Sequence, residues 1–272
     1  MECVKTLATG LKEMIVGTVP AANLTDTPAA IIKLIDSLAR TDLPTSPPSV
    51  YIDLEGIDIG RQGSISILQV YILPSKETFL VDVHTLGKQA FCTPNTSGLT
   101  LQTILESELI PKVIFDVRSD SDALYSHFGV KLGGAIDLQL MELATRSHSR
   151  KFVNGLAKCM DRDLVQTSEE FRVRGAIKQR GKELFATEKG GRCEVFNDRP
   201  LDPAIVDYCT QDVELMPKLW EIYNAKLSTL HTGWATKIQE ETRARILRSQ
   251  SPAYNGQGQQ MARAPSGFSS IA

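Results

Sequence analysis

The sequence has few of the residue types that mark several classes of protein. Only five of its 272 residues are cysteines, an odd number, and they lie far apart at Cys3, Cys92, Cys159, Cys193 and Cys209. Such spacing argues against a disulfide framework and a zinc cluster, and it fits a reducing cytosolic or nuclear compartment. No apolar run approaches the roughly 20 residues needed to cross a membrane, so we expect no membrane span.

Neither sign of charge dominates, since 30 lysines and arginines face 32 aspartates and glutamates. A formal net charge of −2 argues against a protein that coats a polyanion by charge alone. Residues 151–199 nevertheless hold 11 basic and 8 acidic residues. A solvated helix face explains residues 172–182 equally well, whereas Lys189, Arg192 and Arg199 are expected to contact a phosphate-bearing substrate.

A pair of acids follows the first strongly apolar segment. Residues 49–54 are rich in β-branched and aromatic side chains and follow two prolines, which is typical of a central strand. Asp53 and Glu55 are two positions apart, so they project from the same face of that strand. Two neighbouring carboxylates repel unless a cation neutralises them, and hard oxygen ligands favour Mg²⁺ or Mn²⁺. An exposed acidic strand end is the commoner explanation for such a pair taken alone.

A tyrosine and an aspartate share one face of a late helix. Residues 202–223 have apolar residues at helical spacing, with Asp202 as the N-cap and Pro203 in the first turn. Tyr208 and Asp212, at i and i+4, are therefore neighbours on that helix. A core tyrosine beside a chance aspartate is the alternative for this segment alone.

A further acid lies at a turn from strand to helix. The short apolar run at residues 112–115 is expected to be a strand, and a helix is expected to start near Ser119. Asp120 would then lie in the first helical turn, where the helix dipole favours a negative charge. A simple helix-capping aspartate is the alternative.

Together, the three motifs resemble those of the DEDD 3′-to-5′ exonucleases. The order Asp53-x-Glu55, Asp120, Tyr208-x-x-x-Asp212 is similar to the tyrosine-bearing subgroup that includes ribonuclease D and the Werner-syndrome exonuclease domain. The resemblance implies two Mg²⁺ or Mn²⁺ ions, with Asp53 bridging both. It implies that Glu55 and Asp212 complete the ion carrying the nucleophilic water, that Asp120 holds the second ion, and that Tyr208 orients the water.

The resemblance covers residues 46–223 and is nearest to the exonuclease-domain branch that includes Egalitarian. Segments DLEGIDIGRQGSISILQVYI and NDRPLDPAIVDYCTQDVELMPKLW carry it beyond the acids. One departure is Asp116, since many members have asparagine four residues before the middle aspartate. Gln69, on the next strand, is a candidate contact for the terminal nucleotide, although a polar residue satisfied within the sheet is the simpler explanation.

The order of elements predicts an α/β fold. Strands near residues 49–54, 65–73 and 78–83 form an antiparallel meander, and short strands near residues 112 and 130 alternate with helices at 99–109, 119–128 and 136–145. The resemblance implies a ribonuclease H-like mixed sheet flanked by helices.

Four segments are expected along the chain. Residues 1–45 form an extension with one helix, capped by Asp26 or Thr27 and packed on the domain. Residues 46–231 form the exonuclease domain, and residues 232–249 form a C-terminal helix. Residues 250–272, rich in glycine, serine and glutamine, are expected to be a disordered tail.

The leading functional hypothesis is a metal-dependent exonuclease that hydrolyses RNA or single-stranded DNA from 3′ ends by a two-metal-ion mechanism. The alternative is a catalytically weak adaptor of the same fold that binds RNA, and binds protein partners through the C-terminal helix or tail. Another carboxylate-metal nuclease is disfavoured by the spacing between Tyr208 and Asp212.

Overall fold

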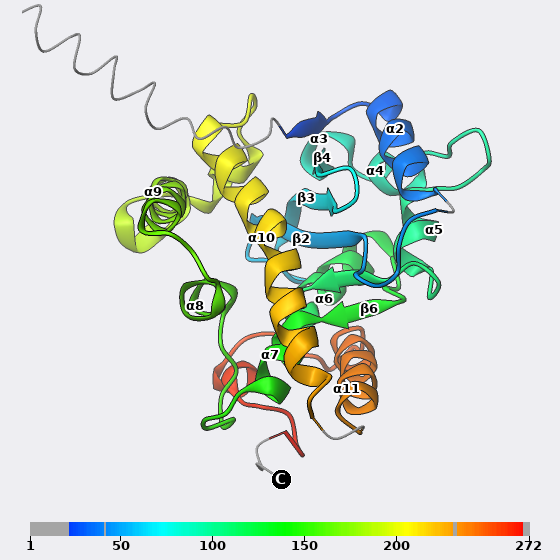
Figure 1. The fold of residues 1–272 in the computed structure, drawn as a ribbon. Helices are drawn as coiled ribbons and strands as arrows, with labels where there is room; N and C mark the ends of the chain where they lie inside the picture. Colours follow the sequence, from blue (N-terminus) through cyan, green and yellow to red (C-terminus); the bar gives the residue numbers. More distant parts are fainter. Residues whose placement is uncertain (1–21, 41, 231–232, 269–272) are drawn as a thin grey trace, which may run out of the picture.

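A six-stranded mixed sheet runs through the centre of the computed structural model, which describes residues 22–40, 42–230 and 233–268 (Figure 1). The strand order is β1-β4-β3-β2-β5-β6. Strands β2, β3 and β4 are antiparallel, whereas the pairs β1–β4, β2–β5 and β5–β6 are parallel. The expected α/β fold, with an antiparallel meander extended by parallel strands, is confirmed. The strands are β1 (Asn23–Thr25), β2 (Val50–Ile57), β3 (Ser64–Ile72), β4 (Glu77–Asp82), β5 (Lys112–Ile114) and β6 (Ala135–Asp137).

Helices cover both faces of this sheet (Figure 1). They are α2 (Pro28–Leu38), α3 (Val83–Leu86), α4 (Gln89–Cys92), α5 (Leu101–Glu106), α6 (Val117–Phe128), α7 (Leu138–Thr145), α8 (Leu156–Asp163), α9 (Ser168–Phe185), α10 (Pro203–Leu227) and α11 (Gly233–Ser249). Short 3₁₀ turns are η1 (Thr187–Lys189), η2 (Cys193–Asn197) and η3 (Gln259–Ala262). Within the described ranges, no helix has both the length and the apolar character that a membrane crossing requires.

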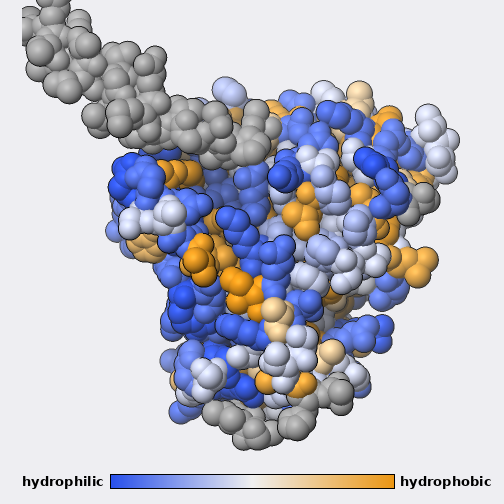
Figure 2. Space-filling view, in the orientation of Figure 1, coloured by the Kyte–Doolittle hydropathy of each residue, from blue (hydrophilic) through white to orange (hydrophobic). Residues whose placement is uncertain are grey.

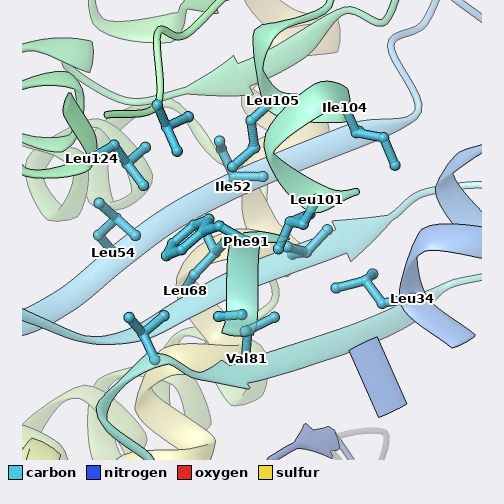
Figure 3. Close-up of a cluster of buried hydrophobic side chains, with 14 of the residues drawn as sticks. Leu34, Ile52, Leu54, Leu68, Val81, Phe91, Leu101, Ile104, Leu105 and Leu124 are labelled. Carbon is cyan, nitrogen blue, oxygen red and sulfur yellow. The ribbon is translucent and has the colours of Figure 1, made fainter. Parts of the chain in front are cut away.

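One face of the sheet packs against α2, α4, α5 and α6. Figure 3 shows Phe91 of α4 among leucine and isoleucine side chains from strands and helices. Ile52 and Leu54 belong to this core, which fixes the orientation of β2. Because strand side chains alternate, Asp53 and Glu55 must project from the opposite face, on the side of α10.

The opposite face packs against α7, α8, α10 and α11. Tyr51 of β2 lies in this second core together with apolar residues of α7 and α10. A smaller cluster joins Ile67 and Leu80 of the sheet to Ile205 and Cys209 at the start of α10. Helix α10 therefore crosses the strand that carries the first acid pair (Figure 1).

The N-terminal helix forms as its capping signals predict. Thr27 is the N-cap of α2, its hydroxyl accepts a hydrogen bond from the Ala30 N–H, and Pro28 occupies the first turn. Buried Ile31, Leu34 and Ile35 then pack α2 onto the sheet. The rest of the predicted extension, residues 1–21, lies outside the described residues, and the segment boundaries stay predictions.

Two short strands differ from the sequence-based expectation. β1 was not expected, because three residues carry too little pattern to identify a strand. The expected strand at Val130 is wrong, since that residue follows Gly129, the C-cap of α6, and the paired strand is β6, at residues 135–137. Gly133 and Gly134 make the intervening turn. Gly134 has a φ of 59°, a conformation that glycine adopts without strain.

The predicted disorder of residues 250–272 is wrong for the part that the structure describes, residues 250–268. Arg61 donates hydrogen bonds at 2.7, 2.9 and 3.0 Å to the backbone carbonyls of Ser249, Ser251 and Pro252. Phe268 is only 1% exposed and packs edge-on against Trp234. The domain supplies the hydrogen-bond donors and the apolar partner that this segment itself lacks. The composition of the segment alone therefore could not predict that it packs on the domain. Residues 269–272 lie outside the described residues.

Candidate active site

Three acids from β2 and α10 converge at one place. Carboxylate oxygens of Asp53, Glu55 and Asp212 all lie within 4.8 Å of one another. The first two project side by side from the middle of β2, and Asp212 faces them from α10. Residues 157 positions apart in the sequence are thus assembled into one carboxylate cluster, as predicted.

The start of α10 explains the placement of Tyr208 and Asp212. Asp202 is the N-cap and accepts a hydrogen bond from the Ala204 N–H at 2.8 Å, with Pro203 in the first turn, as predicted. Tyr208 and Asp212 are 7% and 3% exposed and lie one turn apart on the buried face. The tyrosine therefore belongs to the same face as the acid that completes the cluster.

Asp120 is contributed by a different helix, α6. Helix α6 starts at Val117, two residues earlier than predicted, and Asp120 is in its first turn as predicted. Its oxygens are not part of the 4.8 Å cluster, but the residue is 7% exposed and its carboxyl group is influenced by the charges of Asp53 and Glu55. The structure therefore brings all four predicted acids into one electrostatic environment.

Asp53, Glu55 and Asp120 are destabilised as anions when no divalent ion is bound. Burial, followed by the charge of Asp212, raises the pKa of Asp53 to about 7. Burial and the charge of Asp53 likewise raise the pKa values of Glu55 and Asp120 well above their ordinary range. Clustered hard oxygen donors suit Mg²⁺ or Mn²⁺, and bound divalent ions would remove this repulsion. The donor set thus fits the predicted metals.

A second acidic group, Glu142 with Cys159 and Asp163, is neutralised within the protein. Glu142 is 1% exposed and forms ion pairs with Arg146 and Arg162. Asp163 pairs with Arg162 and accepts a hydrogen bond from the Tyr223 hydroxyl at 2.6 Å. Internal arginines supply the positive charge here, so the geometry does not call for an ion.

Tyr208 lies in an apolar and anionic environment. Phe185 of α9 packs edge-on against its ring at a centroid distance of 5.1 Å. Burial first, and then the charges of Glu55 and Asp212, raise the pKa of its phenol. The hydroxyl group therefore stays protonated at neutral pH and can donate a hydrogen bond, whereas it is a poor base.

Asp116, the residue where the resemblance departs from the usual asparagine, is held by two arginines. Its carboxylate accepts hydrogen bonds from Arg118 at 2.5 and 2.6 Å and from Arg245 of α11 at 3.5 Å. Burial alone would raise the pKa of Asp116, but bonding to Arg118 keeps it below its ordinary value. Its backbone is left-handed, with a φ of 65°, and its N–H donates to Asp137 at 3.1 Å. Asp116 thus fixes the turn that leads to Asp120.

Gln69 lies beside Asp53 on the neighbouring strand β3. It pairs with Asp53 across β2 and β3 and is fully buried. Neither polar atom of its amide has a hydrogen-bond partner among the described residues, which is uncommon for a buried side chain. It adjoins the site as expected, and its contact with a terminal nucleotide stays a prediction.

The three basic residues proposed to bind substrate have partners in the protein. Lys189 donates to the Gln179 side chain at 2.8 Å, and Arg192 pairs with Asp198. Arg199 forms an ion pair with Asp82 at the end of β4 and bonds the carbonyls of Phe196 and Asp198. Arg199 therefore has a structural role, and the substrate contacts of all three stay predictions. Figure 2 shows mostly hydrophilic residues on the face that carries α9 and α10.

Lys178 belongs to the site although it was not among the predicted residues. Its Nζ atom lies 2.6 and 2.5 Å from the two oxygens of Asp212. The sequence left residues 172–182 open between phosphate contact and a solvated helix face, because nothing in the local pattern indicates which helix α9 packs against. The regular spacing of Lys178, Gly181 and Phe185 on one helical face is the signal that could have indicated it.

Comparisons with known proteins agree with this geometry. Residues 25–228 match the family model described as 3′-5′ exonuclease. The mouse (Mus musculus) piRNA biogenesis protein EXD1 is 28% identical over 201 residues, which are 71% of this chain and 32% of that protein. The chain thus spans about a third of the length of this relative.

Solved structures share the fold. Trypanosoma brucei RNase D in complex with RNA U12 superposes with a TM-score of 0.66 at 19% identity, covering 96% of this chain and 81% of that one. Brucella melitensis NrnC with bound Mg²⁺ gives a TM-score of 0.51 at 14% identity, covering 80% and 96% of the two chains. At these identities the structural likeness establishes the fold alone.

Proposed function

The chain belongs to the 3′-5′ exonuclease family, and on that premise we propose that it removes nucleotides from the 3′ ends of single-stranded nucleic acid with two divalent metal ions. The observation that carries the proposal is the convergence of Asp53, Glu55 and Asp212 within 4.8 Å, with Tyr208 one turn from Asp212. Asp120, in the same electrostatic environment, completes the set of acids that the reaction needs.

Hydrolysis of a phosphodiester requires charge neutralisation, an activated water and support for the leaving 3′ oxygen. Two bound Mg²⁺ or Mn²⁺ ions supply all three. The chain's own contribution is to hold these ions: Asp53 would contact both, Glu55 and Asp212 one of them, and Asp120 the other. The raised pKa values of Asp53, Glu55 and Asp120 support this assignment, because burying unpaired acids destabilises the fold unless a ligand compensates.

Tyr208 is proposed to orient the attacking water. Its protonated hydroxyl can donate a hydrogen bond, and Phe185 restricts the position of its ring. A positioned donor of this kind accelerates a reaction through orientation, without removing a proton. The proton of the water would therefore pass to another acceptor, such as a carboxylate of the cluster.

RNA is the substrate that we propose first, and its support comes from relatives. One solved structure that covers 96% of this chain is an RNase D in complex with RNA U12, and the mouse relative is named as a piRNA biogenesis protein. The bound Mg²⁺ in NrnC supports magnesium as the ion.

Digestion of labelled strands tests the proposal. Single-stranded RNA and DNA of the same sequence, labelled at either end, would be incubated with wild type and Asp53→Asn, with Mg²⁺ or EDTA. A 5′-labelled strand should shorten one nucleotide at a time with Mg²⁺, and a 3′-labelled strand should release labelled mononucleotide at once. Internal cleavage, or equal digestion by Asp53→Asn, would contradict the proposal.

A protein-binding role is the second candidate, and one observation favours it. Leu247 of α11 is 70% exposed at the edge of a pocket between α10, α11 and β6, which Trp220, Leu227 and Ile246 also line. An adaptor that acts only through this surface would bind partners equally well after Asp53→Asn. The intact acid cluster makes the enzyme the leading proposal.

A further inference from the structure

Helix α9 packs one face against the tyrosine and the aspartate of α10. Lys178, Gly181 and Phe185 lie on that face, at spacings of three and four residues. The contact is close: a β-carbon added to Gly181 would lie 2.6 Å from Cδ2 of Tyr208. Phe185 meets the same ring edge-on. The position of Lys178 relative to Asp212 is therefore set by a tight helix contact.

The Lys178 ammonium group contacts both carboxylate oxygens of Asp212. It lies 2.6 Å from Oδ1 and 2.5 Å from Oδ2, and its side chain is only 14% exposed. The same ammonium lies 4.2 Å from the ring centroid of Tyr208, where the aromatic face also favours a cation. A single positive charge thus contacts two of the five residues proposed to carry out the reaction.

Lys178 binds the carboxylate oxygens of Asp212 that a metal ion would need as ligands. An ion held by Asp53, Glu55 and Asp212 must bind at least one oxygen of Asp212, and both already contact the ammonium. The ammonium of Lys178 also places a positive charge directly beside the carboxylate cluster that Asp212 forms with Asp53 and Glu55. It therefore performs, in part, the neutralisation that the ion would perform.

We propose that Lys178 is an internal counter-cation of the metal site, which holds Asp212 in the ion-free protein and is displaced from it when a divalent ion binds. The proposal rests on the function proposed above. Two cations so close together repel, and lysine, with a flexible four-carbon chain, can move away without any backbone change. Lys178 thereby keeps the ion-free acids together and raises the ion concentration at which the site fills.

Under this proposal, Lys178→Met should lower the thermal stability of the ion-free protein and increase its affinity for divalent ions. In EDTA the variant should unfold at a lower temperature than wild type, because Asp212 loses its counter-charge. In calorimetric titrations with Mn²⁺ and Mg²⁺, the variant should bind the first ion about tenfold more tightly, since no cation competes for Asp212. A merely structural ion pair would lower the stability and leave the affinity unchanged or weaker.

Lys226→Met is the matched control. Lys226 lies on α10, and its Nζ atom is 5.7 Å from the ring centroid of Tyr223. The substitution therefore also removes a positive charge that contacts an aromatic ring. Lys226 is 14 residues beyond Asp212, about 21 Å along α10. Its ion affinity should equal that of wild type.

Lys178→Arg provides a test that does not depend on the folding of Lys178→Met. A guanidinium can bond both carboxylate oxygens in a fixed fork, so displacing it should require a higher ion concentration than in wild type. Equal or tighter ion binding by Lys178→Arg, or unchanged binding by a folded Lys178→Met, would overturn the proposal. If wild type binds no ion, or if Asp53→Asn binds as well as wild type, the metal site itself fails and the proposed function fails with it.

Discussion

Replacing Asp53 by asparagine should stabilise the ion-free protein while it abolishes activity. The pKa of Asp53 in the folded protein is about 7, against an ordinary value of 3.8, with burial as the largest cause. The folded protein therefore binds more protons than the unfolded chain between these two values. Stability of the ion-free protein is highest at the acid end of this range and falls as the pH rises through 7.

The size of the effect follows from the shift. A pKa of about 7 in the folded protein, against 3.8 in the unfolded chain, corresponds to about 4 kcal/mol of unfolding free energy at most. Asp53 keeps some solvent exposure and shares its charge with Glu55 and Asp212, so the expected gain in unfolding free energy at pH 8 is about 2 to 4 kcal/mol. For a chain of this size, that gain raises Tm by roughly 5 to 10 °C.

Thermal unfolding in EDTA, followed by circular dichroism between pH 5 and pH 8, measures this directly. The control is Asp82→Asn, because Asp82 is 1% exposed but pairs with Arg199. Burial alone would raise the pKa of Asp82, but hydrogen bonds from Arg199 and Thr85 hold it below its ordinary value. The Asp82→Asn control should therefore lose roughly 2 to 4 kcal/mol of unfolding free energy at pH 8. A less stable Asp53→Asn, or a control with the same sign, would refute the reasoning.

Three other predictions test separate parts of the account. Tyr208→Phe should lower the single-turnover rate by roughly 10- to 1,000-fold with ion binding retained. Asp212→Asn should lower the rate and also weaken ion binding in calorimetry. A Tyr208→Phe variant with full activity would remove the tyrosine from the mechanism. Deleting residues 250–272 should lower Tm, because Phe268 is buried and Arg61 loses two backbone acceptors, the carbonyls of Ser251 and Pro252; an unchanged Tm would show that the segment contributes no stability. Burial lowers the pKa of Lys112 to about 8, so the stability of wild type relative to Lys112→Met should rise between about pH 8 and pH 10 in urea unfolding, and a flat difference would contradict this.

Local periodicity was enough to predict which neighbouring residues share a face. Alternation along β2 places Asp53 and Glu55 on one face, and helical spacing places Tyr208 beside Asp212, because both rules depend only on backbone geometry. The antiparallel meander followed from the strand-and-turn pattern for the same reason. What joins β2 to α10 is tertiary packing, and the family resemblance supplied that link.

Tertiary pairing explains what the sequence did not reveal. Lys178 could be recognised as part of the site only once α9 was known to pack on α10. Likewise, Arg199 was expected to contact the substrate, and its partner, Asp82, is distant in sequence. Long basic side chains find partners that local pattern does not specify.

The central claim is that these acids hold two ions, and anomalous diffraction from crystals soaked in Mn²⁺ with a nucleoside monophosphate tests it most directly. Two peaks are expected roughly 3.5 to 4 Å apart, one beside Glu55 and Asp212 and the other beside Asp120, with Asp53 contacting both. Asp53→Asn crystals should lose at least one peak. A single peak elsewhere, or no peak beside these four acids at saturating Mn²⁺, would contradict the claim.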